Sequence, residues 1–124
     1  MTDQHRSYVG QYVYGGIDGH EDTSTVTCLH NKRIVKTATV PSDPAGLTAS
    51  LRRWFPGARL TAAYEAGCSA FVLHRTLIKG GLTNIVVHPA SIAVAANDKV
   101  KTDRRDSKKL ALDLADGRLR GVPT

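Results

Sequence analysis

Short runs of β-branched and aromatic residues divide the first forty residues into strands. The segment Tyr8–Ile17 is rich in tyrosine, valine and glycine and ends just before Asp18. The β-branched segment Thr23–His30 and the alternating segment Arg33–Val40 follow it, separated by the polar pair Asn31–Lys32. Such runs favour strands, and a short polar pair between two of them is typical of a turn. The pattern predicts that the chain opens with an antiparallel meander of three strands.

The rest of the chain alternates between helical and extended patterns. Apolar residues at helical spacing predict helices over residues 42–55, 68–79 and 103–115, and Pro56–Gly57, Gly80–Gly81 and Asp116–Gly117 mark their ends. Two short apolar runs, residues 59–64 and 83–87, predict strands between these helices. The order β-β-β-α-β-α-β-α therefore predicts an α/β protein with a mixed five-stranded sheet and flanking helices.

The composition is that of a single globular domain. The chain has 124 residues, of which 41% are hydrophobic and 23% charged. No apolar run is long enough for a membrane span, and the N-terminus has no apolar signal core, so we expect a cytoplasmic location and no membrane partner. Cys28 and Cys68 have no partners at metal-ligand spacing, and we expect both to be reduced thiols.

The charge is unevenly distributed. The net charge is +6, and residues 99–109 read KVKTDRRDSKK, a basic run with only two aspartates. A basic balance suits a polyanion, because lysine and arginine displace counterions from phosphates. The run is either a solvated helix face or a phosphate-contacting surface. The candidate nucleic-acid-binding residues are Lys99, Lys101, Arg104, Arg105, Lys108 and Lys109.

Four acidic residues are predicted to meet at one edge of the sheet. Asp18 follows the first predicted strand and Glu65 follows the fourth. If these strands are parallel neighbours, both acids lie at their carboxyl ends, where α/β sheets bind ligands. Asp103 and Asp106 are three residues apart at a predicted helix start, so they would share one face. The four carboxylates converge if that helix packs across the sheet edge.

Carboxylates gathered in this way repel one another unless a cation compensates their charge. Oxygen ligands select Mg²⁺ or Mn²⁺, and such ions promote phosphoryl transfer. Each acid also has a structural alternative. Asp18 would be a turn residue before Gly19, and Glu65 a charge at a helix N-terminus. Asp103 and Asp106 would be a helix cap and a first-turn acid.

Two histidines are weaker candidates. His20 lies next to Asp18 in the chain, and His88 follows the last predicted strand at the same edge. Either one could contact substrate. An exposed loop position for His20 and a capping role for His88 are the simpler interpretations.

Three segments carry a resemblance to a known family. GIDGH at residues 16–20, YEAG at 64–67 and KTDRRDSKKLA at 101–111 are similar to motifs of the DEDD transposases of the insertion-sequence "one-ten" family and of their Piv-type invertase relatives. The family's acids match Asp18, Glu65, Asp103 and Asp106. The resemblance covers nearly the whole chain and implies a ribonuclease-H-like, RuvC-like domain that binds Mg²⁺, a fold with the predicted order of elements.

The resemblance also implies partners and a larger assembly. These are DNA, a structured guide RNA, and a dimer or tetramer of the full-length protein. It implies a RuvC-like domain over residues 1–117 and a linker over 118–124 towards a separate serine-bearing domain that the chain lacks. The sequence departs from the family pattern at Glu21, where a basic residue is usual, at Ser107, usually alanine, and at His88, usually asparagine.

Four functions are compatible with these observations. The first is the N-terminal catalytic domain of a transposase or recombinase, incomplete in this fragment. The second is a stand-alone nuclease acting on DNA junctions, and the third is a non-catalytic nucleic-acid-binding fragment. The fourth is one lobe of a sugar-kinase-like protein, which lacks here a second lobe and a second phosphate loop.

Overall fold

The chain folds around one mixed sheet with helices on both faces. The computed structural model describes residues 8–66, 70–88 and 106–122. Its elements, in chain order, are β1 (Tyr12–Gly19), β2 (Thr23–His30), β3 (Arg33–Pro41), α1 (Pro44–Trp54), β4 (Arg59–Glu65), α2 (Ala70–Lys79), β5 (Thr83–Val87) and α4 (Ser107–Ala115). The five strands lie in the order β3-β2-β1-β4-β5. The predicted fold class is confirmed.

The sheet combines the predicted meander with two parallel strands. β1, β2 and β3 pair antiparallel, whereas β1 pairs parallel with β4 and β4 pairs parallel with β5. The turn between β2 and β3 has positive φ at both Asn31 and Lys32, 52° and 66°. Positive φ at both central residues is the geometry of a tight two-residue hairpin. The parallel pairing of β1 with β4 is the relationship on which the predicted site depends.

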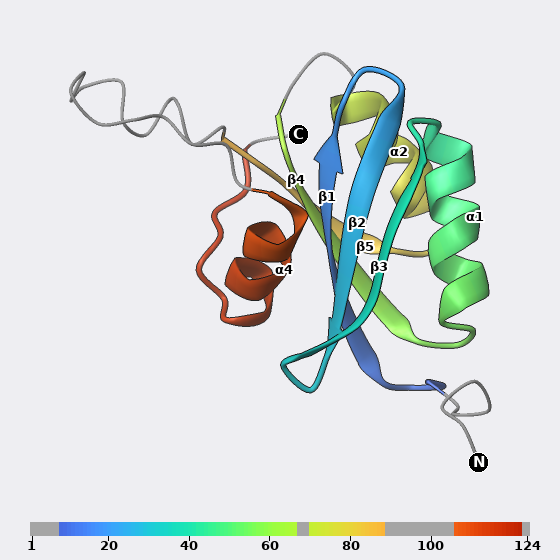
Figure 1. Ribbon diagram of the computed structural model, residues 1–124, viewed down its shortest axis with the longest axis vertical. Helices are drawn as coiled ribbons and strands as arrows, with labels where there is room; N and C mark the ends of the chain where they lie inside the picture. The colour runs from blue at the N-terminus through green and yellow to red at the C-terminus, as the bar shows by residue number, and fades with distance from the viewer. Residues whose placement is uncertain (1–7, 67–69, 89–105, 123–124) are drawn as a thin grey trace.

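Helices α1 and α2 cover one face of the sheet, and α4 covers the other (Figure 1). The main core lies on the first face, where Leu47 and Leu51 of α1 and Leu77 of α2 pack with strand residues such as Val13 and Val26. On the other face, α4 buries three apolar residues, Leu110, Ala111 and Leu114. The acids discussed below belong to the α4 face.

The guanidinium of Arg52 joins helix α1 to the loop between α1 and β4 and to the loop between α2 and β5. Its Nε donates to the Gly80 carbonyl at 3.0 Å, and its Nη2 donates to the Gly81 carbonyl at 2.8 Å. Its Nη1 donates to the Ala58 carbonyl at 3.3 Å. Three carbonyl groups of two loops are therefore satisfied by one side chain of α1.

Some boundaries differ from the prediction. β1 begins at Tyr12 rather than Tyr8, because Gly10 has φ +74° and Gln11 donates to the Tyr8 carbonyl in a turn. The strand also continues past Ile17, since Asp18 and Gly19 still pair with β2. β4 likewise includes Glu65, which pairs with Val87. Asp18 is thus the last residue but one of β1 and Glu65 the last residue of β4, and neither is the first residue of a loop.

Only part of the apolar surface of α2 and α4 is buried. On α2, Leu77 is buried, but Phe71, Val72 and Ile78 are exposed. At about 100° per residue, these three positions point away from Leu77. On α4, Leu112 is exposed, whereas Leu110 and Leu114 are buried. Only one side of each helix reaches the sheet.

The segment after α4 returns to the sheet. Gly121 forms an antiparallel bridge with Val87, and the Val122 nitrogen donates to the Val86 carbonyl at 2.6 Å. Val122 also packs against the main core. Residues 121–122 therefore cover the outer edge of β5.

Candidate functional site

Asp18 and Glu65 lie at the ends of two neighbouring parallel strands in matching register. The last pair between β1 and β4 is Ile17 with Tyr64, and the two acids directly follow it. Neighbouring strands lie about 4.8 Å apart, and side chains alternate between the faces of a sheet. Because Ile17 and Tyr64 both belong to the main core, Asp18 and Glu65 occupy the opposite, α4-covered face. The prediction that these acids meet at one edge is supported by this register.

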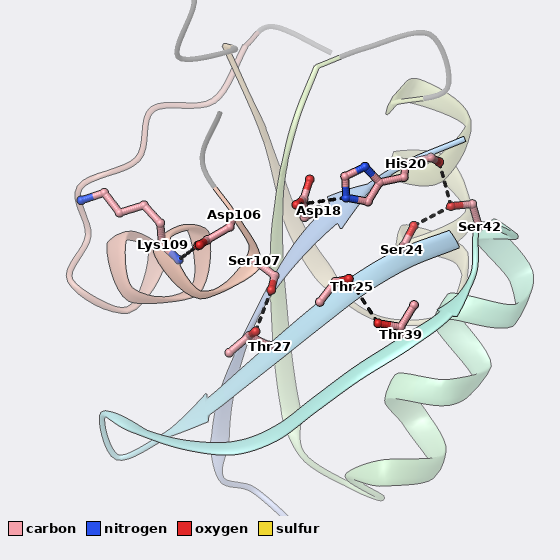
Figure 2. A network of polar contacts seen from close by, with 10 residues as sticks. All are labelled: Asp18, His20, Ser24, Thr25, Thr27, Thr39, Ser42, Asp106, Ser107 and Lys109. Carbon is pink, nitrogen blue, oxygen red and sulfur yellow. Dashed lines mark hydrogen bonds and ion pairs between the residues drawn. The ribbon is translucent and has the colours of Figure 1, made fainter. Parts of the chain in front are cut away.

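Asp18 is largely enclosed, with 15% of its side chain exposed. Its Oδ2 lies 3.4 Å from Nε2 of His20, which is itself about half exposed. The backbone around His20 is fixed: its nitrogen donates to the Thr23 carbonyl, and its carbonyl accepts from Ser42 Oγ at 3.1 Å. His20 is therefore held facing Asp18 (Figure 2).

Two serines tie this hairpin to the start of α1. Ser42 Oγ lies 2.7 Å from Ser24 Oγ, and the Ser42 nitrogen donates to the Asp22 carbonyl at 2.9 Å. Ser24 is buried. The loop that carries His20 is thus joined to the β3–α1 junction, a connection that the sequence pattern did not suggest.

Asp106 is the N-cap of α4. Its backbone is extended, with φ −76° and ψ 176°, and its side chain accepts a hydrogen bond from the Lys109 nitrogen at 2.8 Å. The helix therefore starts at Ser107, not at Asp103, so the helical-spacing argument for a shared face does not apply to Asp106. Asp103 itself lies outside the described residues. Asp106 caps the helix, which is the structural role weighed for Asp103, and it is not the first-turn acid that the structural alternative made it.

Ser107 places the start of α4 on the face that carries Asp18. Its hydroxyl lies 2.7 Å from the hydroxyl of Thr27, and both side chains are buried (Figure 2). Thr27 is the β2 partner of Gly16, two residues before Asp18. Two residues of strand span about 7 Å, so the capped end of α4 lies close to the strand-end acids.

Gly16 allows α4 to rest directly on the sheet. A methyl group on Gly16 would overlap the carbonyl oxygen of Ser107 and approach the Ala111 nitrogen to 2.6 Å. Gly15 is different, since a methyl group there would meet only ordinary contacts, 3.8 Å or more, such as that with Cys28 Sγ. Gly16 is not among the residues that the sequence predicted for the site. A glycine inside a strand is the signal that could have found it, because it often marks close backbone approach.

Of the predicted ligands, Asp18 and Glu65 lie side by side at one edge of the sheet, and Asp106 lies at the start of α4 on the same face. Residues 8–66, 70–88 and 106–122 contain no group of three histidine, cysteine or acidic side chains arranged to hold a metal ion, so these three acids do not form such a group by themselves. His88 follows β5 at the same edge and is exposed. The donor set itself consists of carboxylate oxygens, the chemistry that Mg²⁺ and Mn²⁺ prefer.

Two of the predicted nucleic-acid-binding residues can be placed. Lys108 and Lys109 are exposed in the first turn of α4, and Lys109 Nζ lies 3.3 Å from Asp113 Oδ1, one helical turn later. Arg118 and Arg120 extend the exposed basic surface after the helix. Lys99, Lys101, Arg104 and Arg105 lie outside the described residues.

The thiol of Cys28 is buried in the main core and is free. Burial raises its pKa from 9.0 to about 12, although the charge of Lys36 opposes this shift. Burial likewise raises the pKa of Tyr64, whose hydroxyl donates to Asn84 Oδ1 at 2.7 Å. A thiol kept protonated in this way is not a nucleophile or a metal ligand. Cys68 lies outside the described residues.

The fold and the sequence each have a known counterpart. The chain is 30% identical over 102 residues, 80% of its length, to the transposase for insertion sequence element IS1533 of Leptospira borgpetersenii, and it spans 30% of that protein. It superposes on T. thermophilus RuvC, solved in complex with a Holliday junction substrate, with a TM-score of 0.57 and 11% identity, covering 90% of this chain and 99% of RuvC. No protein-family model matches the chain.

A second solved structure shares the fold. It is a Bacteroides thetaiotaomicron protein with an actin-like ATPase fold and unknown function, with a TM-score of 0.51 and 12% identity, covering 73% of this chain and 39% of that one. Because the sequence identities are only 11% and 12%, both superpositions show a similarity of fold alone. The chain is thus a ribonuclease-H-like domain homologous to part of a transposase. In the described part of the chain, no helix is both long and apolar enough to cross a bilayer.

Proposed function

We propose that this chain is the N-terminal catalytic domain of a DNA transposase or site-specific recombinase that carries out metal-dependent phosphoryl transfer on DNA. The observation that carries the proposal is the matched register of Asp18 and Glu65 on the α4 face, with the capped start of α4 seated two residues away along β1. The homology to a transposase and the likeness to RuvC support it.

In this proposal, Asp18, Glu65 and Asp106 hold Mg²⁺ or Mn²⁺ together with Asp103, which lies outside the described residues. A bound divalent ion would supply positive charge to the oxygens of the phosphoryl group during an in-line displacement. The protein's own contribution is placement. The sheet fixes the two strand-end acids, and the cap bond to the Lys109 nitrogen fixes one oxygen of Asp106, which leaves Oδ2 as the oxygen that we assign to the metal.

The basic residues would hold the DNA backbone beside these acids. Lys108 lies two residues after the cap of α4 and is exposed. Lysine neutralises phosphates and contributes affinity that falls as salt rises. We assign the same role to Lys109 and to the candidates outside the described residues, namely Lys99, Lys101, Arg104 and Arg105.

The wider assembly follows from the family resemblance. We propose that residues 1–117 form the RuvC-like DEDD domain and that 118–124 lead towards a serine-bearing domain in the full-length protein. We also propose a structured guide RNA as a partner, and a dimer or tetramer as the working assembly. IS1533 transposase is more than three times as long as the matched region, so the acids of this chain are proposed to act together with a second domain.

A stand-alone junction nuclease is the second candidate. It is favoured by the superposition on RuvC, in which almost the whole of that chain is covered. A non-catalytic nucleic-acid-binding fragment is the third. It is favoured because no three-ligand metal group occurs among the described residues.

Cleavage of supercoiled DNA and of a four-way junction, with Mg²⁺ or Mn²⁺, separates these candidates. We expect Asp18→Asn and Asp106→Asn to abolish cutting. Asn remains a good helix cap, so Asp106→Asn removes the charge without removing the cap. Asp43→Asn is the matched control, because Asp43 caps α1 in the same way, accepting from the Gly46 nitrogen at 3.0 Å.

Each outcome assigns one candidate. Equal cutting by the wild type and both variants contradicts the metal centre. Cutting of the junction alone favours the junction nuclease. An absence of cutting, together with salt-sensitive binding that Arg104→Ala and Arg105→Ala weaken, favours the binding fragment.

A further inference from the structure

A hollow lies at the end of the sheet opposite the acids, where β4 and β5 begin. Its volume is about 320 Å³ and it is open to solvent on one side. It is lined by Tyr12, Ala58, Arg59, Leu60, Thr61, Gly81 and Thr83. This volume is at the lower end of the range for ligand sites, about 300–1,000 Å³, and suits a group of the size of one nucleoside rather than a larger ligand.

Four side chains of this hollow, those of Tyr12, Arg59, Thr61 and Thr83, share the face that carries the acids. Tyr12 pairs with Arg59, and two residues later along β4, Thr61 pairs with Thr83. These positions have the same parity as Glu65 along β4 and therefore project from the α4 face. The hollow and the acid edge are two ends of one surface, with α4 seated between them over Gly16.

Tyr12 is an exposed aromatic ring held by a cation. It is the first residue of the central strand β1 and is 58% exposed. The guanidinium carbon of Arg59 lies 5.7 Å from the ring centroid. Bases of single strands stack on aromatic rings and on arginine planes, and such stacking does not depend on base identity.

The charges of the hollow select the class of ligand. Among the described residues, its lining contains Arg59 and two threonine hydroxyls and no acid. An aromatic surface, hydrogen-bonding hydroxyls and a guanidinium together match a nucleotide, which offers a base and a phosphate.

We propose that this hollow holds one unpaired nucleotide of a nucleic-acid strand, with its base on Tyr12 and its phosphate beside Arg59. The inference rests on the nucleic-acid function proposed above and adds a second contact to it, remote from the acids. Six residues separate Tyr12 from Asp18 along β1, or about 20 Å. A strand in duplex geometry rises 3.4 Å per nucleotide, so this distance equals about six nucleotides.

Binding of labelled single-stranded oligonucleotides, measured by fluorescence anisotropy in EDTA, tests the inference independently of cleavage. We expect Tyr12→Ala to weaken the binding of a 12-nucleotide strand by about tenfold, the order of one lost stacking contact. Tyr12→Phe should restore the affinity, because phenylalanine stacks without the hydroxyl. The affinity for a blunt duplex should be unchanged in Tyr12→Ala, since a duplex offers no unpaired base.

Lys36 serves as the control for Arg59, because it also lies beside an aromatic ring. Lys36 Nζ lies 4.9 Å from the centre of the Trp54 ring, an aromatic–cation pair at the β3 edge of the sheet, away from the hollow. Arg59→Ala should weaken single-strand binding severalfold, and Lys36→Ala should not. Parallel DNA and RNA oligonucleotides identify the source of the strand, and a dependence on Tyr12 in either one supports the inference.

Two results would overturn the inference. The first is an equal affinity of the wild type and Tyr12→Ala for the single strand. The second is that Tyr12→Ala changes self-association and not oligonucleotide affinity, which would make the hollow a protein contact. Unfolding temperatures should agree between wild type and Tyr12→Ala, because so exposed a side chain contributes little to the core. The proposed function can fail separately. Asp18→Asn should retain Tyr12-dependent binding whether or not the wild type cuts DNA.

Discussion

The hydroxyl groups of Thr27 and Ser107 lie 2.7 Å apart and are both buried, although 80 residues separate them in the chain. This contact joins the second strand of the sheet to the first turn of the last helix. It is therefore one of the few polar contacts that fix α4, and with it Asp106, relative to the strand-end acids.

Removing either partner of this contact should destabilise the fold. Ser107→Ala leaves the Thr27 hydroxyl without its partner, and we expect the free energy of unfolding to fall by about 1–2 kcal/mol. Thr27→Val should have a similar effect. The double variant should lose less than the sum of the two, as measured by urea denaturation in a double-mutant cycle. Strictly additive losses would show that the two hydroxyls do not interact.

Adjacent glycines in β1 should respond oppositely to the same substitution. Gly16→Ala places a methyl group against the backbone of α4, and we expect a loss of about 2 kcal/mol or more, together with lost cleavage, because Asp106 moves with the helix. Gly15→Ala meets only ordinary contacts and should be neutral or slightly stabilising. Thermal unfolding of the pair measures the difference, and equal stabilities would contradict the close seating of α4.

Arg52→Ala should lower stability more than Arg53→Ala. Arg52 satisfies the carbonyls of Ala58, Gly80 and Gly81, whereas Arg53 makes one long contact, 3.4 Å, to Ser50 Oγ. Hydrogen bonds from charged donors contribute about 1.5–3 kcal/mol each, so we expect a loss of about 2 kcal/mol or more for Arg52→Ala. Urea denaturation compares the two variants, and similar losses would contradict the assigned role.

Stability should fall at alkaline pH because of Cys28. The unfolded thiol loses its proton near pH 9.0, whereas the folded thiol keeps it until about pH 12. The stabilising contribution is therefore complete below pH 9 and is lost as the pH rises towards 12. Between pH 8 and 11 the wild type should lose about 2 kcal/mol more than Cys28→Ala, measured by urea denaturation. Parallel curves for the two proteins would contradict this assignment.

The sequence predicted the fold because its local signals agreed with one another. The β-branched runs, the Asn31–Lys32 turn and the helix expected over residues 42–55 all have counterparts in the structure. Strand–helix alternation then left few topologies. Composition could not set the strand ends, because the pairing of Asp18 with Thr25 is a tertiary hydrogen-bonding relationship.

The site was only partly predictable. The parallel pairing of β1 with β4 follows from topology, so the proximity of Asp18 and Glu65 could be expected. The position of α4 could not be predicted, because it depends on the absence of a side chain at Gly16 and on the contact of the Ser107 hydroxyl with Thr27. Helical spacing also misplaced the start of α4, since one aspartate cap looks much like another in sequence.

The most direct test of the central claim is calorimetric titration of this chain with Mn²⁺. Wild type should bind the ion, Asp18→Asn should weaken binding by at least about tenfold because it removes a charged oxygen ligand, and Asp43→Asn should bind as the wild type does. Equal Mn²⁺ affinity of the wild type and Asp18→Asn would contradict the proposed metal centre at the ends of β1 and β4.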